Sequence, residues 1–224
     1  KNVFAFGSGM SAITNALLVF VAQGKNVVTS KHLFGNTVAL LNNTFARLGV
    51  ETRAVDLLDL NAVREAIDEQ TVCLFLEIVT NPQMEVADIS ALAEIAHEKG
   101  VPLMADTTII PFTQFSAKRL GVDVEVVSST KYISGGATSL GGLVIDYGTF
   151  PVVNMRLRFE LIPNVGGYMS PHVAYMQSLR LETLDARYRV QAQNALTDRR
   201  IAYLIARRRL QDLTSQSSPT ERSR

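Results

Sequence analysis

The chain has 224 residues, of which 47% are hydrophobic and 19% charged, and its formal net charge is +1. These values are ordinary for a globular α/β protein, and they give no electrostatic case for a nucleic acid or a membrane surface as partner. The single cysteine, Cys73, excludes an internal disulfide framework and fits a reducing compartment such as the cytoplasm, and no apolar run is long enough to span a membrane.

Short apolar runs alternate with segments of helical periodicity from residue 2 to residue 146. The runs predict strands at Val3–Phe6, Val27–Thr29, Thr52–Val55, Val72–Leu76, Val101–Ala105, Val122–Val127 and Gly142–Asp146. The periodic segments predict helices at Met10–Ala22, Asn36–Leu48, Asn61–Asp68, Asp88–Lys99 and Thr113–Leu120. This alternation predicts a mostly parallel sheet with helices on both faces, a three-layer α/β/α architecture.

Polar side chains collect where the predicted strands end. They are Ser8, Glu77, Asn81, Asp106, Thr108, Ser128, Thr130 and Lys131. Ligands of open α/β sheets bind at this edge, although loops that merely connect elements are also polar, so the clustering alone is weak support for a site.

A lysine follows the strand at 122–127, in the stretch Ser128-Ser129-Thr130-Lys131-Tyr132. An amine in this position can form an imine with an aldehyde cofactor, and the neighbouring hydroxyls can hold a phosphate. A solvated turn with an exposed lysine explains this stretch equally well, so the remaining motifs decide between the two interpretations.

The first strand runs into Gly7-Ser8-Gly9-Met10-Ser11-Ala12, a formal match to G-x-G-x-x-A before a helix. Backbone N–H groups at a helix start favour an anion. A dinucleotide site also requires an acidic residue at the end of the second strand, and Thr29-Ser30-Lys31 has none there. The pattern therefore indicates a phosphate site. No metal site is expected.

Two more residues fit pyridoxal phosphate (PLP), which requires a carboxylate at its ring nitrogen and a flat group over its ring. Asp106 ends a buried strand, where an unpaired carboxylate would be costly, and Phe34 could cover the ring. The alternatives are a helix or turn cap for Asp106 and a core aromatic for Phe34.

The sequence resembles the Cys/Met-metabolism PLP-dependent enzymes of fold-type I over about residues 2–195. The motifs that carry the resemblance are Ser8-Gly9-Met10-Ser11-Ala12-Ile13, Glu77-x-x-x-Asn81-Pro82, Ala105-Asp106-Thr107-Thr108, Ser128-x-Thr130-Lys131-Tyr132, Gly166-Gly167-Tyr168-Met169-Ser170-Pro171 and Leu181-Glu182-Thr183-Leu184-x-x-Arg187. The family includes cystathionine γ-synthases, γ-lyases and homoserine-ester sulfhydrylases.

The resemblance implies a role for each matching residue. Lys131 would carry PLP as a Schiff base and move protons, Asp106 would pair with the ring nitrogen, and Asn81 would touch the ring's 3-oxygen. The predicted phosphate and pocket residues are Ser8, Gly9, Met10, Thr108, Ser128 and Thr130, with Phe34 stacked on the ring. The implied chemistry is replacement or elimination at the γ-carbon of an amino-acid substrate, in a cytoplasmic homodimer or homotetramer of methionine and cysteine metabolism.

The sequence also departs from the family pattern. Phe34 stands where a tyrosine is usual, and Thr107 where an asparagine is usual. We expect residues 1–149 to form the PLP-binding large domain without its N-terminal arm, and 150–196 to form a linker and long helix that begin a truncated C-terminal domain. Residues 197–224, with seven arginines and three acidic residues, are expected to be a divergent, disordered basic tail.

Two functions stay open at this point. The first is a transsulfuration enzyme, with an O-acetyl- or O-succinylhomoserine sulfhydrylase favoured over a cystathionine or methionine γ-lyase. The second is a catalytically silent relative that folds but binds PLP weakly or not at all.

Overall fold

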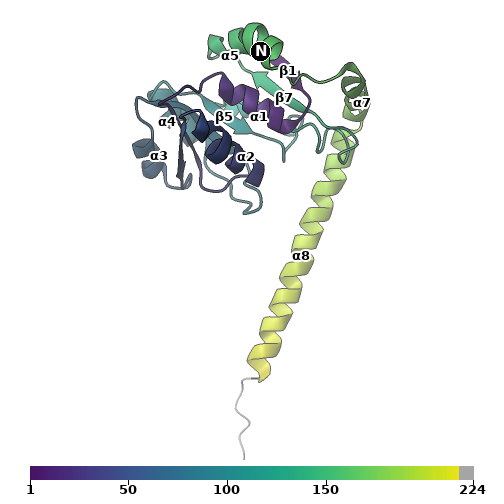
Figure 1. Cartoon of the computed structure of the whole chain (residues 1–224). Coiled ribbons are helices and arrows are strands. Elements are labelled where there is room, and N and C mark those ends of the chain that lie inside the picture. Colours follow the sequence, from purple (N-terminus) through teal and green to yellow (C-terminus); the bar gives the residue numbers. More distant parts are fainter. Residues whose placement is uncertain (217–224) are drawn as a thin grey trace, which may run out of the picture. The chain divides into compact units, whose positions relative to one another are not determined.

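The structure is a computed structural model that describes the backbone of residues 1–216 and the side chains of residues 1–200 (Figure 1). It divides into two units, Lys1–Leu184 and Asp185–Arg224. The first unit contains the sheet and its covering helices, and the described part of the second unit belongs to helix α8 (Leu184–Gln216). None of the described helices combines the length and the apolar character needed to cross a membrane.

Strands and helices alternate through the first unit, as the sequence pattern predicts. The strands are β1 (Asn2–Phe6), β2 (Asn26–Ser30), β3 (Glu51–Val55), β4 (Thr71–Glu77), β5 (Leu103–Asp106), β6 (Val124–Val127) and β7 (Gly142–Asp146). The helices are α1 (Gly9–Leu18), α2 (Gly35–Ala39), η1 (Leu40–Phe45), α3 (Leu60–Ala66), α4 (Ile89–Glu98), η2 (Ala117–Leu120), α5 (Pro151–Arg156), η3 (Leu157–Leu161), α6 (Ile162–Val165) and α7 (Pro171–Leu181). Each predicted strand is present.

The seven strands form one sheet in the order β1-β7-β6-β5-β4-β2-β3. Strands β2 to β6 pair in parallel, whereas β7 is antiparallel to both β6 and β1. It follows that β1 runs in the same direction as β6, so that β1 to β6 all end at one edge of the sheet. This edge, called the carboxyl edge below, carries the polar residues that the sequence places after each strand.

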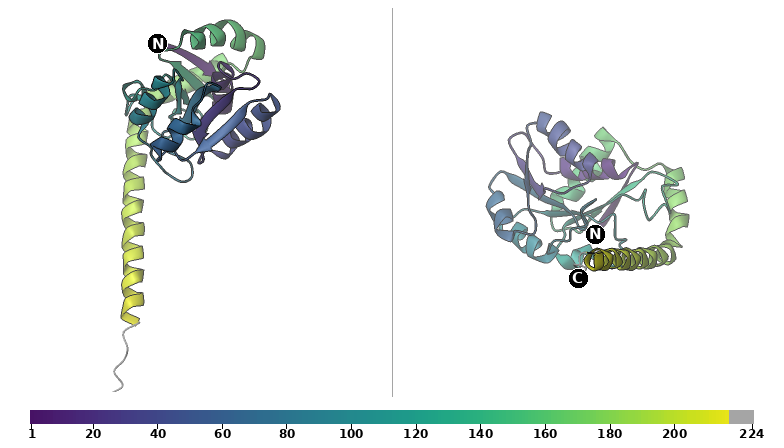
Figure 2. Two further views of the ribbon diagram at one scale, coloured as in Figure 1. Left: turned by 90° about the vertical axis from the view of Figure 1, so that its left-hand side faces the viewer. Right: turned by 90° about the horizontal axis from the view of Figure 1, so that it is seen from below.

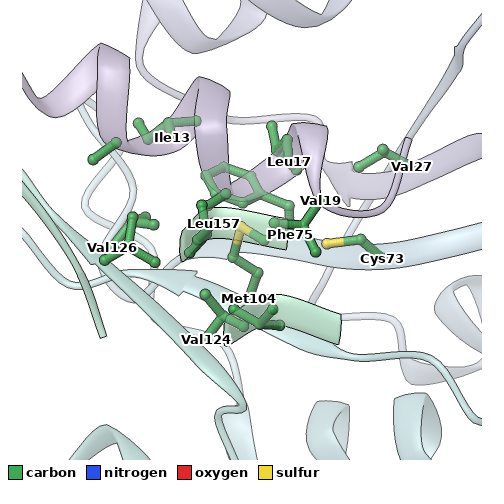
Figure 3. Packing of buried hydrophobic residues seen from close by; sticks show 14 of the residues in the cluster. Ile13, Leu17, Val19, Val27, Cys73, Phe75, Met104, Val124, Val126 and Leu157 are labelled. Carbon is green, nitrogen blue, oxygen red and sulfur yellow. The ribbon is translucent and has the colours of Figure 1, made fainter. Parts of the chain in front are cut away.

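Helices cover both faces of the sheet and give the predicted three-layer architecture (Figure 2). Adjacent residues of β4 point to opposite faces: Phe75 lies in a cluster with Ile13 and Leu17 of α1, and Leu74 lies in a cluster with Leu92 of α4. Figure 3 shows the first cluster, in which Phe75 packs near Leu17 and Leu157. Burial on both faces explains why the central strands read as continuous apolar runs.

Helix starts and ends follow local signals in the sequence. The side chain of Ser8 caps α1 by accepting the N–H of Ser11 at 3.0 Å, and Asp88 caps α4 by accepting the N–H of Ala91 at 3.1 Å. Gly100 follows α4 with a φ of 69°, a left-handed conformation that favours glycine after a helix. The Ser8 cap fixes where α1 begins and where the loop before it approaches the carboxyl edge.

The predicted helix at residues 113–120 is wrong in extent, because only η2 forms, between Ser116 and Gly121. The preceding residues make turns instead: the N–H of Ile110 donates to the Thr107 carbonyl, and that of Gln114 to the Pro111 carbonyl, at 3.0 and 2.8 Å. These turns leave too few residues before Gly121 for a longer helix.

The C-terminal part also differs from the sequence expectation. Helices α5 to α7 belong to the first unit, and Val153, Leu157 and Leu161 lie in the core cluster beside α1. Helix α8 continues through Gln216, so residues 197–216 are helical rather than disordered. The expectation of disorder for residues 217–224 lies outside the described residues.

Candidate functional site

The carboxyl edge brings the predicted site residues together from strands that are far apart in the sequence. Ser8 follows β1, Asp106 ends β5, and Ser128 follows β6, next to the Lys131 turn. Parallel pairing of β5 with β6 sets Asp106 beside Val126, two residues before Ser128. The sheet therefore places the candidate phosphate, ring-nitrogen and lysine residues along one line.

The start of α1 meets the chain after β6. A Cβ atom added to Gly9 would lie 2.6 Å from the Ser128 Cβ and 2.7 Å from its Oγ, so only glycine fits at this contact. As the first residues of the helix, Gly9 and Met10 have N–H groups without an intrahelical acceptor, and neither N–H has another acceptor among the described residues. Two backbone donors and the Ser128 hydroxyl thus converge where an anion can bind.

Thr108 joins this cradle to Asp106. Its backbone N–H donates to Asp106 Oδ1 at 2.9 Å, and its Oγ1 accepts the N–H of Ser128 at 2.7 Å. One threonine therefore orients the carboxylate at the end of β5 and holds the segment that leads to Lys131. The sequence motif predicted this residue as part of the pocket but not its bridging position.

Asp106 is partly exposed at the strand end, yet the surrounding protein removes much of its solvation. Burial raises the pKa of its carboxyl group, the hydrogen bonds from Thr108 oppose that rise, and the charge of Glu125 adds to it. No cationic side chain forms an ion pair with Asp106 among the described residues. A partly buried carboxylate without a cation is suited to bind a protonated ring nitrogen.

Glu77 ends β4 directly beside Asp106, its register partner on β5. Its carboxylate accepts two backbone N–H groups, from Phe34 at 2.7 Å and from Asn81 at 3.1 Å. Burial, with a contribution from the Asp106 charge, raises the pKa of Glu77 to about 7, against the opposing effect of these hydrogen bonds. The sequence marks Glu77 as a polar strand end and as the first residue of the Glu77-x-x-x-Asn81-Pro82 motif, but it assigns Glu77 no role, because its amide partners cannot be identified before the fold is known.

Phe34 and Asn81, predicted to contact the ring, are thus linked through Glu77. Both side chains are exposed, Phe34 to 41%. Asn81 precedes Pro82 in a cis peptide bond, and Phe34 precedes α2. The structure brings these two residues to the same carboxylate, beside the strand that ends in Asp106. Their contacts with the ring stay a prediction.

Lys131 lies in the turn after β6. Its backbone N–H donates to the Ser128 carbonyl at 3.2 Å, and its exposed side chain has no hydrogen bond or ion pair among the described residues. The hydroxyl of Thr130 is engaged with Gly141, whose N–H it accepts at 3.0 Å and to whose carbonyl it donates at 3.1 Å. Thr130 therefore closes the base of the loop that carries Lys131, and its predicted contact with phosphate stays a prediction.

A fully buried carboxylate lies on β6, the strand next to the one that ends in Asp106. Glu125 is 1% exposed and accepts the Thr107 hydroxyl at 2.6 Å and the Tyr147 hydroxyl. Burial and this carboxylate raise the pKa of Tyr147 above its ordinary range. Thr107, which replaces the asparagine usual in the family, thus has a buried partner. The sequence offers one signal for this network, a charged residue inside an apolar strand.

The described residues fit PLP on four points. Free N–H groups and the Ser128 hydroxyl can hold a phosphate, and the glycine contact leaves the backbone accessible to it. The Asp106 carboxylate can accept a hydrogen bond from the protonated ring nitrogen. Lys131 offers an amine that is unpaired among the described residues, and Phe34 offers an exposed ring. Each requirement of the cofactor has a matching group at the carboxyl edge.

Comparison with known proteins agrees with this geometry. The family model for Cys/Met metabolism PLP-dependent enzymes matches residues 1–210, past the point near Thr197 where the sequence was expected to leave the family pattern. Methionine gamma-lyase of Arabidopsis thaliana is 39% identical over 194 residues, which cover 86% of this chain and 44% of that protein. O-succinylhomoserine sulfhydrylase of Pseudomonas aeruginosa is 36% identical over 195 residues, covering 87% and 47%.

Solved structures give the same result. A structure of O-acetylhomoserine sulfhydrylase of Wolinella succinogenes is 47% identical, with a TM-score of 0.77, over 82% of this chain and 57% of that one. A structure of a putative O-acetylhomoserine (thiol)-lyase of Campylobacter jejuni, described with N'-pyridoxyl-lysine-5'-monophosphate, is 28% identical, with a TM-score of 0.78, over 82% and 53%. The chain spans about half the length of the curated relatives it matches.

Proposed function

Because this chain belongs to the Cys/Met metabolism PLP-dependent enzymes, we propose that the protein catalyses replacement at the γ-carbon of a homoserine ester by a sulfur nucleophile. The proposed substrates are O-acetyl- or O-succinylhomoserine and sulfide or a thiol. The similarity to the W. succinogenes and P. aeruginosa sulfhydrylases supports this choice.

The convergence at the carboxyl edge carries the proposal. The Lys131 amine is unpaired among the described residues, and it follows closely on Ser128, which contacts Gly9 and is bonded through Thr108 to Asp106. PLP supplies an aldehyde that captures amino groups and a ring that stores the electrons released from the substrate. The protein then has to position this cofactor and move protons.

We propose one residue or group of residues for each charged or protonated part of the cofactor and for the substrate protons. We assign the phosphate to the N–H groups of Gly9 and Met10 with the hydroxyls of Ser8 and Ser128, whereas the Thr130 hydroxyl, bonded to both backbone groups of Gly141, supports the site by holding the loop of Lys131. Asp106, oriented by Thr108, holds a proton on the ring nitrogen, and Asn81 contacts the ring's 3-oxygen. Lys131 Nζ removes and returns protons at the substrate carbons, as an amine held close to the reacting atoms can.

Phe34 bears on the class of substrate. A phenylalanine over the ring supplies a flat apolar face but no hydroxyl, so it cannot donate a proton to a leaving group. A homoserine ester releases a carboxylate, which needs less protonation than the thiolate leaving group of a thioether. This difference favours esters over thioethers as substrates. Acid–base help by a side chain is worth about 10²–10⁴-fold when it is needed.

A γ-lyase is the second candidate, supported by the 39% identity to the A. thaliana methionine gamma-lyase. Such an enzyme would consume water and release ketobutyrate, ammonia and a sulfur product, methanethiol from methionine or hydrogen sulfide from homocysteine, instead of joining a sulfur nucleophile to the carbon skeleton. The same residues would hold the cofactor in both reactions, so the two candidates differ in products and not in the site at the carboxyl edge.

Two measurements test the function. The chain with added PLP should develop an absorption band near the visible edge that Lys131→Ala abolishes. Lys25→Ala, which removes a lysine bonded to Gln70, should leave the band intact. Thioether or thiol formation from an acylhomoserine, compared with ketobutyrate release from methionine, then separates sulfhydrylase from lyase. Absence of the band in the wild-type chain would favour the catalytically silent relative.

Cellular setting and assembly complete the proposal. We place the protein in the cytoplasm, supported by a lone cysteine that is buried and unpaired. A homodimer or homotetramer is supported by exposed apolar side chains on α5, η3 and α7, where Met155, Phe159 and Tyr175 are 56%, 67% and 63% exposed. Sedimentation equilibrium of the chain measures the assembly directly.

A further inference from the structure

Among the described residues, Glu77 connects the segments that carry Phe34 and Asn81. These segments, residues 31–34 and 80–85, are called the ring-face loop and the turn loop below. Glu77 accepts the Phe34 N–H at 2.7 Å and the Asn81 N–H at 3.1 Å, and the two amides lie 43 and 4 residues away in the sequence. Farther out, His32 Nδ1 on the ring-face loop lies 2.7 Å from Glu85 Oε2 on the turn loop.

Only the ionised form of Glu77 can accept both amide N–H groups, one on each oxygen. A carboxylate has two oxygens that both accept, so each N–H has its own acceptor, whereas a protonated carboxyl group turns one oxygen into a donor. Hydrogen bonds to a charged acceptor are stronger than those to a neutral one. One added proton therefore weakens the connection between the two loops.

The surroundings of Glu77 make this proton uptake accessible near neutral pH. Asp106 lies beside it on β5, and burial together with that charge disfavours the ionised form. Lys31 and His32 on the ring-face loop and Glu85 on the turn loop form ion pairs of their own. Glu77 thus lies between a like charge and two amide donors, whose effects on its ionisation are opposite in sign.

We propose that ionised Glu77 is a positioning residue that fixes the ring-face loop and the turn loop around the cofactor site, and that protonation of Glu77 loosens both loops. The role toward the cofactor rests on the proposed function. The connection between the loops does not, because both amide contacts are present in the chain alone.

The first experiment measures amide exchange of the full chain without PLP. Protection factors of the Phe34 and Asn81 amides, from NMR hydrogen–deuterium exchange corrected for intrinsic rates, should fall at least about tenfold from pH 8.5 to pH 5.5. In Glu77→Gln, at least one of the two amides should be poorly protected throughout, with no pH dependence. Unchanged wild-type protection across this range, or full protection of both amides in Glu77→Gln, would overturn the proposal.

Two variants serve as controls. Asp59 also accepts two backbone N–H groups, of Asn61 and Ala62 at 3.0 and 3.1 Å, but caps α3 on an exposed surface. Asp59→Asn should leave Phe34 and Asn81 exchange unchanged. His32→Gln removes the other titratable connection, and the pH dependence should persist in it. If His32→Gln removes the pH dependence instead, protonation of His32 and not of Glu77 loosens the two loops, and the proposal is wrong.

A second experiment tests the role toward the cofactor. The dissociation constant of PLP, followed by absorbance, should be about tenfold higher in Glu77→Gln than in wild type at pH 8.5, and the two should converge at pH 5.5. Equal affinity at pH 8.5 would exclude the positioning role. If wild type itself binds no PLP, the proposed function fails while the exchange measurement still decides whether Glu77 connects the loops.

Discussion

Gly9 and Ser128 approach so closely that the first residue of α1 has no room for a side chain. This contact fixes the distance between the helix start and the segment that leads to Lys131, and so shapes the candidate phosphate cradle. It joins residues from β1–α1 and from the end of β6, across the intervening strand β7.

Gly9→Ala should weaken PLP binding at least tenfold. The added methyl group would lie 2.6 Å from the Ser128 Cβ, so one of the two segments has to shift. Overpacking of this kind costs about 1–3 kcal/mol, and tenfold in affinity corresponds to about 1.4 kcal/mol. Fluorescence titration with PLP measures the change. Gly35→Ala, where the methyl group meets open space, is the matched control and should bind normally.

Asp106→Asn should lower kcat by about 10²–10³-fold, the range seen when a preorganised electrostatic group is removed. The amide keeps the shape of the carboxylate and can still bond to Thr108, but it cannot stabilise a protonated ring nitrogen. Product formation from O-acetylhomoserine and sulfide is the measurement. A variant with wild-type kcat would show that Asp106 acts only as a turn cap, the alternative that the sequence leaves open.

Glu77 should make the chain less stable as pH rises from about 4.5 to 7. Its pKa is raised from 4.5 to about 7 in the folded chain, so the folded state keeps a proton that the unfolded state has lost. The stabilisation is complete below pH 4.5 and is lost as pH rises through 7. Urea unfolding of wild type and Glu77→Gln at several pH values tests this. The difference in unfolding free energy should change across that window, and a constant difference would contradict it.

Tyr147→Phe should reduce the free energy of unfolding by about 1–3 kcal/mol, because the buried Glu125 carboxylate then loses one of its two hydroxyl donors. Tyr175→Phe, at a 63% exposed position, is the control and should change stability little. Urea unfolding at pH 8 gives both values. Equal stability of the two variants would mean that solvent replaces the lost donor at Glu125.

Cys73 should resist thiol reagents until the chain unfolds. Its side chain is fully buried on β4 in the cluster beside α1, and burial raises the pKa of its thiol far above the ordinary value. Reaction with a chromogenic disulfide should therefore be slow in buffer and rapid in guanidinium. Rapid reaction in buffer would show that β4 opens locally, against its central position in the sheet.

The sheet was predictable because both of its faces are buried. Strands such as Val72–Leu76 are uninterrupted apolar runs, and Asp88 and Gly100 mark the limits of the helix between β4 and β5 as local capping signals do. Segment 113–120 failed as a helix prediction because hydrogen bonds in the turns at Thr107 and Pro111, not periodicity, determine its backbone.

The site likewise contains residues that could be predicted from the sequence and residues that could not. Gly9, Asp106 and Lys131 stand in motifs whose local chemistry is readable, and the parallel sheet places them at one edge. Glu77 and Glu125 act through partners from other segments: the Phe34 amide is 43 residues from Glu77, and the Tyr147 hydroxyl 22 residues from Glu125. Nothing local in the sequence specifies such pairings, so their roles appear only in the folded chain.

Thr130 fastens the two ends of the segment that follows β6, with its hydroxyl shared by both backbone groups of Gly141. Residues 131–140 consequently form a closed ring of chain with a fixed neck. Insertions or deletions in the middle of this loop would therefore leave the positions of Thr130 and Gly141, and with them the backbone at Lys131, unchanged. The length of this loop can then vary while the anchoring of Lys131 stays the same.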